Sequence, residues 1–401
     1  MKQDGKPALK PKLRFPEFRD APQWDEMKLE ELISTVTPPK KLQTSSYLAE
    51  GLFPIVDQSQ DYICGWTNDN EALVKDSLPL IVFGDHTCVL KLVNQQFAQG
   101  ADGIKIFRAR IRVGTEYLFH FLNFQPVVME DYKRHFSILK EKKVHYSDIN
   151  LGEQQKIAEC LTSLDELIAA HGQKLDALKT HKKGLMQQLF PRAGETVPRL
   201  RFPEFQDAGE WVVKSIGQLG AVITGSTPST VQPEYYGGDR LFVSPADISD
   251  DRFIEKTKTT LTELGFRETR PIKANSILFV CIGSTIGKIA QNRHECATNQ
   301  QINSVVPNSN NSDGFVYYAL SGLADHIANL AGIQAVPIVN KSLFSSVELA
   351  VPKLPEQNRI ADCLSSLDET IFAQSQKLEA LKTHKKGLMQ QLFPSTAEVE
   401  A

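Results

Sequence analysis

The sequence predicts an α+β protein, in which two mixed α/β domains are joined by an antiparallel two-helix coiled coil with pseudo-twofold symmetry. Residues 153–191 and 356–394 are two copies of one helical segment and are identical at 30 of 39 positions. A shorter motif, LRFPEF, precedes each globular region, at residues 13–18 and 200–205. The two globular regions themselves show no gap-free similarity. One scaffold therefore occurs twice, with a different domain in each copy.

The repeats divide the chain into seven consecutive segments. Residues 191–198 begin and end with proline and contain a glycine, so this stretch is expected to be a linker. The predicted segments are an N-terminal motif segment (1–19), a first domain (20–152), a first helix (153–191), a linker with the second motif (192–207), a second domain (208–355), a second helix (356–394) and a tail (395–401).

Each repeated segment has apolar residues at alternating spacings of three and four, the heptad pattern of a helix that packs against another long helix. A Phe-Pro pair ends each copy, because proline cannot continue the hydrogen-bond ladder. In an antiparallel pair, the polar seam residues His171 and Gln374 meet near the middle and fix the register. The alternative is a parallel homodimeric coiled coil, in which His171 faces another His171. We expect the intramolecular pair, because two matching helices already lie in one chain.

The antiparallel arrangement has a further consequence for the first LRFPEF motif. The first helix ends within a few residues of the second motif. By the pseudo-symmetry, Phe15 and Phe18 should pack near the end of the second helix. The two termini are then expected to lie close together.

The composition is that of a globular protein, with 41% hydrophobic and 23% charged residues. The apolar runs, such as Ile277–Ile282, are too short to span a bilayer, and no secretory signal follows the N-terminus, so a cytoplasmic location is expected. Six cysteines without CxxC spacing indicate reduced, mostly buried thiols. The net charge of −3 means that any nucleic-acid binding must come from local basic clusters.

Four short motifs occur in order along the two copies. They are GDHT at Gly84–Thr87, GSTP at Gly225–Pro228, NQQIN at Asn299–Asn303 and PKLPEQ at Pro352–Gln357. This order, together with the repeated helices, resembles the specificity subunits of type I restriction-modification systems. The resemblance covers essentially the whole chain, and it depends on the layout and not on any single motif.

The resemblance implies a non-catalytic, DNA-reading chain built from two target-recognition domains. Each domain would read one half of a bipartite site in double-stranded DNA, and the paired helices would act as a spacer and dock two methyltransferase subunits. Nuclease/translocase subunits would join to complete the restriction enzyme. No cofactor is expected in this chain, because S-adenosylmethionine, ATP and magnesium would bind to the partner subunits.

Symmetry and length also favour a bipartite reader. The backbones of B-DNA carry dyads, so a pseudo-twofold protein can place two readers equivalently on the duplex. At about 1.5 Å per residue, a helix of this length spans roughly 57 Å. That span corresponds to about 17 base pairs. Lengthening the helices by a turn should therefore change the gap between half-sites and leave the half-sites unchanged.

In the first domain, Ile104–Val113 alternates apolar and basic residues, which predicts a strand with Phe107, Ala109, Ile111 and Val113 toward a core. The opposite face would present basic residues to phosphates or guanines, although a solvated outer face explains the pattern equally well. The candidate DNA-binding residues of this strand are Lys105, Arg108, Arg110 and Arg112.

Asp85, His86 and Thr87 follow an apolar run and should lie on a loop at a strand end, where recognition residues are common. No second His or Cys stands at ligand spacing from His86, so we expect no metal site. In the second domain, two small-residue stretches are expected to approach a DNA backbone closely. Their candidate DNA-binding residues are Ser226, Thr227, Ser284, Thr285 and Lys288.

Gly283–Lys288 (GSTIGK) is not a nucleotide-binding loop, because three residues instead of four separate its glycines and Ile289 follows the lysine. The nearby amides can pair bidentately with adenine, although buried structural amides are equally consistent with the sequence. These candidates are Asn299, Gln300, Gln301 and Asn303.

Two enzymatic readings are not favoured. No methyl-donor fingerprint is present, and the triplet of Asp131, Glu141 and Lys143 is a loose match to a nuclease site in a basic turn. The main alternative to DNA recognition is a tandem adaptor that binds protein partners through its helix pair and never contacts nucleic acid. The slightly acidic net charge favours that adaptor, and the arginine strand opposes it.

Overall fold

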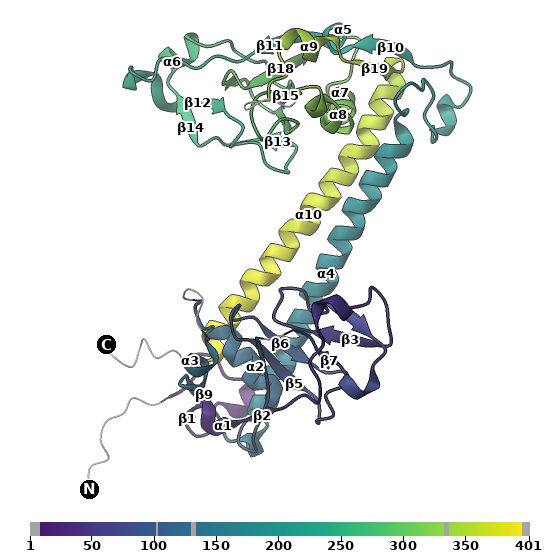
Figure 1. The fold of residues 1–401 in the computed structure, drawn as a ribbon. Helices are drawn as coiled ribbons and strands as arrows, with labels where there is room; N and C mark the ends of the chain where they lie inside the picture. The colour runs from purple at the N-terminus through teal and green to yellow at the C-terminus, as the bar shows by residue number, and fades with distance from the viewer. Residues whose placement is uncertain (1–8, 102, 130–133, 333–336, 395–401) are drawn as a thin grey trace. The chain divides into compact units, whose positions relative to one another are not determined.

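The computed structural model describes residues 9–101, 103–129, 134–332 and 337–394 (Figure 1). The chain forms two compact units, one of residues 1–172 with 376–401 and the other of residues 173–375. Asp131 and the tail 395–401, both considered above, lie outside the described residues. Each unit contains one domain and part of each long helix, so the two are described separately.

The first unit contains two sheets. The larger is a four-stranded antiparallel sheet in the order β2-β8-β5-β6, and the smaller is a three-stranded sheet in the order β4-β3-β7. The strands are β1 (Asp25–Lys28), β2 (Ile33–Val36), β3 (Phe53–Val56), β4 (Gly65–Thr67), β5 (Leu80–Gly84), β6 (Leu90–Val93), β7 (Ala98–Gln99), β8 (Ile104–Ala109) and β9 (Lys143–Tyr146). The helices are α1 (Leu29–Leu32), α2 (Thr115–Phe124), α3 (Phe136–Lys140), the start of α4 (Glu153–Leu189) and the end of α10 (Leu354–Leu392).

The ends of both long helices complete the core of the first domain. Tyr117 and Phe121 of α2 are buried in one cluster with Ile157 and Leu161 of α4. Phe393, just after α10, is 1% exposed in the same cluster. The domain therefore folds around residues from both ends of the chain.

The second unit has a five-stranded sheet in the order β11-β18-β15-β16-β13 and a three-stranded sheet β14-β12-β17. The strands are β10 (Val212–Ser215), β11 (Gly220–Thr224), β12 (Tyr236–Val243), β13 (Phe253–Ile254), β14 (Thr259–Leu261), β15 (Ile277–Val280), β16 (Ile289–Asn292), β17 (Ala297–Thr298), β18 (Ile302–Pro307) and β19 (Glu348–Val351). The short helices are α5 (Ile216–Leu219), α6 (Glu263–Arg267), α7 (Asp313–Gly322), α8 (Ala324–Asn329) and α9 (Lys341–Ser346).

The two domains share one topology despite their dissimilar sequences. The order β2-β8-β5-β6 corresponds strand by strand to β11-β18-β15-β16, and β4-β3-β7 corresponds to β14-β12-β17. The first domain closes with the antiparallel pair β1-β9, and the second closes with β10-β19. The second domain differs by one added strand, β13, which pairs with β16 in parallel. The predicted α+β fold with two sheet-containing domains is thus confirmed.

Within each unit the two long helices run antiparallel. In the first unit, Lys385 near the end of α10 donates to both carboxylate oxygens of Asp165 near the start of α4, each at 2.5 Å. In the second unit, Lys182 of α4 lies 2.5 Å from Asp368 of α10. These two pairs are repeat equivalents, so both units have the same helix register. The pairing predicted from the heptads is confirmed in each unit, whereas a meeting of His171 with Gln374 would join the units and stays a prediction.

The LRFPEF motifs lie where the antiparallel arrangement requires. The backbone N–H of Leu13 donates to the carbonyl of Gln391 at 3.0 Å, and Leu200 donates to Gln188 at the same distance. Phe15 and Leu388 of α10 both pack against the first-domain core, as expected for a motif near the end of the second helix. Among the described residues, no helix is both long enough and apolar enough to cross a membrane.

Candidate nucleic-acid interface

The second-domain candidates gather at one edge of the main sheet. Because β11 and β15 both run antiparallel to β18, the end of β11, the start of β18 and the end of β15 meet at the same edge. We call the three connections at this place the second-domain edge; it consists of residues 225–229, 281–288 and 299–301. All of the second-domain candidates except Asn303 lie on it.

Close backbone packing holds these connections together. The N–H of Gly225 donates to Ile302, and that of Ser226 donates to Thr298. A β-carbon on Gly225 would lie 2.2 Å from the carbonyl oxygen of Asn299, so only glycine fits there. The predicted close approach at this glycine is therefore to another part of the same edge.

The four amides have different environments. Asn303 is 3% exposed and accepts a hydrogen bond from Thr224 at 2.7 Å, so it has the structural role named above as the alternative. Asn299 donates through Nδ2 to Oε1 of Gln301, and Nε2 of Gln301 donates to the carbonyl of Ile282. Gln300 is exposed, and its Oε1 accepts from the hydroxyl of Thr227 at 2.5 Å.

The hairpin between β15 and β16 supplies the remaining candidates. Ser284 and Lys288 are exposed, and Thr285 is half-buried. The ammonium group of Lys288 donates to the carbonyl of Ile248 at 3.0 Å. This lysine therefore carries a positive charge at the second-domain edge while it helps to hold a neighbouring loop.

The corresponding edge of the first domain carries the GDHT loop. We call it the first-domain edge: residues 37–41 after β2, residues 85–89 after β5, and residues 100–101 and 103 between β7 and β8. Asp85 is buried, and its carboxylate accepts a hydrogen bond from the N–H of Phe136 at 2.8 Å. Thr87 donates to the carbonyl of Gln58, and His86 is half-buried. Asp85 and Thr87 thus stabilise the loop itself.

Lys105 also lies at the first-domain edge, because it is the second residue of β8. It is exposed, and its ammonium lies 5.9 Å from the centre of the Phe136 ring. Its nearness to the GDHT loop follows from the pairing of Phe83 with Lys105. Lys40, which sequence reasoning did not select, is on the same edge and pairs with Asp69.

The prediction of one arginine-bearing strand face is wrong. Strand β8 ends at Ala109, and the chain then turns, so Arg110 and Arg112 lie in the turn before α2. Ile111, predicted to face the core, is 91% exposed. The strand is buried on both faces, with Ile106 in one core cluster and Phe107 in another, so simple alternation does not describe it.

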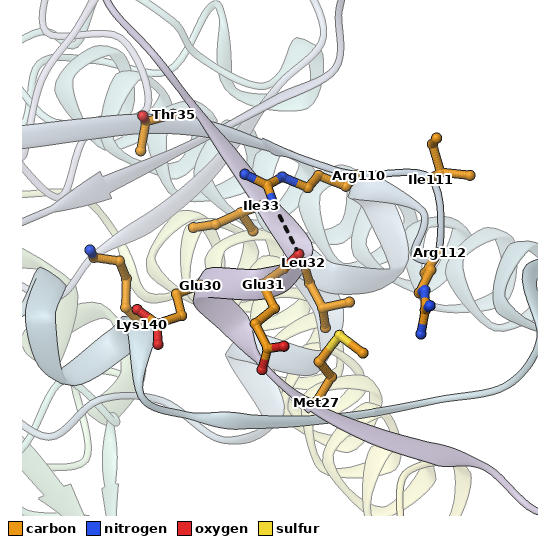
Figure 2. Close-up of a pocket in the computed structure, with 10 residues that line it drawn as sticks. All are labelled: Met27, Glu30, Glu31, Leu32, Ile33, Thr35, Arg110, Ile111, Arg112 and Lys140. Carbon is orange, nitrogen blue, oxygen red and sulfur yellow. Dashed lines mark hydrogen bonds between the residues drawn. The ribbon is translucent and has the colours of Figure 1, made fainter.

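The three arginines are therefore separated. Arg108 forms an ion pair with Asp76 at 2.6 Å. Arg110 and Arg112 line a groove beside α1, where a guanidinium N–H of Arg110 donates to the carbonyl of Glu31 (Figure 2). This groove is at the opposite end of β8 from Lys105, and its lining mixes Glu30 and Glu31 with the basic residues.

Two identical clusters anchor the domains to the helices, and sequence reasoning missed their role. Arg14 of the first motif pairs with Glu153, the first residue of α4, which also accepts from the indole N–H of Trp24 at 3.0 Å. In the second unit, Arg201 and Trp211 make the same contacts to Glu356. The hydrogen bonds to Glu356 raise the pKa of Arg201. The sequence signal that could have revealed them is the repetition of the motif, the tryptophan and the glutamate in both copies.

The two domains contact the helix pair through different residues at one equivalent position. His120, the sixth residue of α2, is 1% exposed and lies 3.0 Å from the hydroxyl of Thr162. Burial, and secondarily the charge of Lys385, lower the pKa of His120 to about 4. Tyr318, the sixth residue of α7, donates instead to Asp368 at 2.6 Å. The contact between His120 and Thr162 is therefore sensitive to acid, because protonation would place a charge on a buried ring.

We expect acid to destabilise the first unit through His120. Its folded-state pKa lies below the ordinary value of 6.5, so between about pH 6.5 and 4 the unfolded chain binds a proton that the folded chain excludes. Stability should fall by about 3 kcal/mol as the pH drops through that window. Urea unfolding at several pH values, compared with His120→Asn, measures this share. Equal pH dependence in both proteins would contradict it.

Among the residues that the structure describes, no group of three or more His, Cys, Asp or Glu side chains is placed to hold a metal ion. Burial raises the pKa of Cys64, Cys281 and Cys296 to about 12, so these thiols are protonated at neutral pH. The candidate interface consists of the hydrogen-bonding loops at the first-domain edge and the second-domain edge.

Residues 208–383 match the family model described as type I restriction modification DNA specificity domain. The chain is 34% identical over 147 residues to the type I restriction enzyme HindI specificity subunit of Haemophilus influenzae, covering 35% of this chain and 32% of that protein. It is 28% identical over 178 residues to the MjaIX specificity subunit of Methanocaldococcus jannaschii, covering 43% and 41%. These matches span about a third to two-fifths of the relatives' lengths.

The fold is similar to that of the S subunit of a type I restriction-modification system from M. genitalium, with a TM-score of 0.68. That comparison covers 96% of this chain and 99% of the other at 14% identity, so it concerns the fold alone. Sequence, domain match and fold agree with the resemblance carried by the repeated helices. Residues 208–383 thus match a type I restriction modification DNA specificity domain, and the chain is similar to specificity subunits of type I restriction-modification systems.

Proposed function

We propose that this chain is the non-catalytic DNA-recognition subunit of a type I restriction-modification complex, and that each domain reads one half of a bipartite target. One observation carries the proposal: the same topology occurs twice, and the loops at its matching edge differ between the copies. A shared scaffold with different exposed loops is what two readers of different half-sites require. The cofactors of methylation and restriction would then bind to partner subunits.

The test uses the full chain in complex with its methyltransferase subunits. Mapping of methylated adenines in DNA modified by the complex should give one bipartite sequence with a fixed unread gap. Exchange of the second domain (208–355) for that of another specificity subunit should change one half-site only. A chain that binds the methyltransferase but selects no DNA sequence would instead be the tandem adaptor.

The repeated helices supply the basis for docking two methyltransferase subunits. Residues 177–191 and 380–394 are identical. Within them, Lys179, His181 and Lys183 are exposed in the first copy, and their equivalents Lys382, His384 and Lys386 are exposed in the second. A partner that recognises one copy meets the same chemistry in the other. Nuclease/translocase subunits would join this assembly to complete the restriction enzyme.

We expect Lys183→Glu to remove one of two methyltransferase subunits, because reversal of an exposed charge repels a complementary surface. Lys386→Glu should have the same effect, and the double variant should bind neither subunit. Native mass spectrometry of the reconstituted complex measures the stoichiometry directly. Exposed Glu166→Lys, outside the identical segment, serves as the control and should keep two subunits. Two subunits on the double variant would exclude this surface as the docking site.

A further inference from the structure

We infer that Gln300 reads a purine of the second half-site through an amide that Thr227 holds in place; this rests on the function proposed above. The first reason is position. Gln300 lies in the connection between β17 and β18, where the ends of three strands meet. The backbone of the preceding residue, Asn299, packs closely against Gly225, where a β-carbon would lie 2.2 Å from the Asn299 carbonyl oxygen. An exposed side chain on this rigid base has little freedom to lose on binding.

The second reason is that the other amides are already engaged. Asn299 and Gln301 bind each other, with a 3.0 Å bond between Nδ2 and Oε1. Asn303 is buried and accepts from Thr224. Gln300 is exposed, whereas Asn299 and Gln301 are half-buried, so its carboxamide is the most accessible of the four to DNA.

The third reason is the direction of its hydrogen bond. The hydroxyl of Thr227 donates to Oε1 of Gln300, so this bond leaves the two N–H donors of the amide for another acceptor. Such a donor matches the N7 acceptor that every purine presents in the major groove. The remaining lone pair of Oε1 can accept from the N6 amino group of adenine, and two donors can satisfy N7 and O6 of guanine.

The fourth reason is that the cations of this edge are directed to backbone carbonyls. The ammonium of Lys288 donates to Ile248 and the guanidinium of Arg270 donates to Thr224, while the exposed Thr227 and Ser284 are neutral. Neutral donors gain little from phosphate charge but discriminate well between base edges. The chemistry therefore points to a base contact.

The experiment uses the full chain with its methyltransferase subunits and a duplex that contains the mapped target. Each purine of both half-sites is replaced in turn by its 7-deaza analogue, which lacks the N7 acceptor. For the wild-type complex, one such replacement in one half-site should weaken binding about tenfold. In Gln300→Ala the same replacement should have no further effect, because the interaction is already gone.

Two more variants test the geometry. Thr227→Val keeps the shape but removes the hydroxyl, so discrimination at the same base should fall only in part. Asn310→Ala removes an exposed amide in the connection that follows β18, at the opposite end of the strand, and should bind like the wild type. Thermal unfolding confirms that each variant is folded. The 7-deazapurine series on the wild-type complex tests the base contact independently of any variant.

The outcomes separate the two proposals. If the wild-type complex selects a target but each 7-deazapurine affects it and Gln300→Ala equally, the role of Gln300 is wrong and the proposed function stands. If Gln300→Ala weakens binding uniformly on every sequence, the residue contacts the DNA backbone and the base-reading inference is overturned. If the wild-type complex selects no sequence, the proposed function fails, and this inference fails with it.

Discussion

Replacement of Glu153 by alanine is expected to destabilise the first unit by about 3–5 kcal/mol, the cost of removing one partner of a buried ion pair. Glu153 is 1% exposed and Arg14 is 6% exposed, so the guanidinium would remain buried without its carboxylate. The indole N–H of Trp24 would lose its acceptor as well. Urea unfolding followed by hydrogen exchange in α2 measures the loss in this unit.

The second unit supplies the matched comparison. Glu356→Ala removes the same contacts to Arg201 and Trp211, so it should destabilise α7 by a similar amount and leave α2 unchanged. The double variant Arg14→Met with Glu153→Leu removes both charges and should recover much of the loss. If Glu153→Ala proved as stable as the wild type, the cluster would have no anchoring role.

Replacement of Phe393 by alanine is expected to cost about 3–5 kcal/mol in the first unit, the range for a large aromatic residue removed from a core. Phe393 is 1% exposed, and its ring centre lies 5.6 Å from that of Tyr117, 5.5 Å from Phe121 and 5.3 Å from Phe124. Its removal leaves a cavity where α10 meets the domain. Denaturant unfolding, with hydrogen exchange in α2 as the local probe, measures the change.

Its repeat equivalent, Phe190, provides the control. Phe190 stacks on Phe315 at 5.4 Å but is only half-buried. Phe190→Ala should therefore cost less than Phe393→Ala and should affect α7 instead of α2. If both substitutions lowered the free energy of unfolding equally, burial would not determine how much each phenylalanine stabilises its unit.

The helices could be predicted from the sequence because their determinants are local and repeated. A heptad pattern fixes which helix face is buried, and each helix ends one residue before the Phe-Pro pair that the sequence predicted as its end. Helix α4 begins at Glu153, as the repeat indicated, and α10 begins at Leu354, two residues before the repeat. The antiparallel contacts follow from the same pattern, as the pair of Asp165 with Lys385 shows.

The shared topology of the domains could not be predicted in the same way, because strand order depends on pairing between distant residues. The failure at Ile104–Val113 has a specific cause. Both Ile106 and Phe107 are buried, so period-two alternation does not apply to β8, and the chain must turn after Ala109 to begin α2 at Thr115. The sequence places the candidate amides close together, but only their hydrogen bonds and exposure distinguish Gln300 from Asn303.

The use of both chain ends in the first core has a consequence for synthesis on the ribosome. Residues 173–375 are contiguous, so the second unit can fold as soon as it has emerged. The first unit must wait for Phe393, although its own strands are made first. At about 5–20 residues per second, that delay lasts roughly 10–45 s. For this period Tyr117 and Phe121 lack their aromatic partner, so the nascent first domain is the part of the chain most in need of a chaperone.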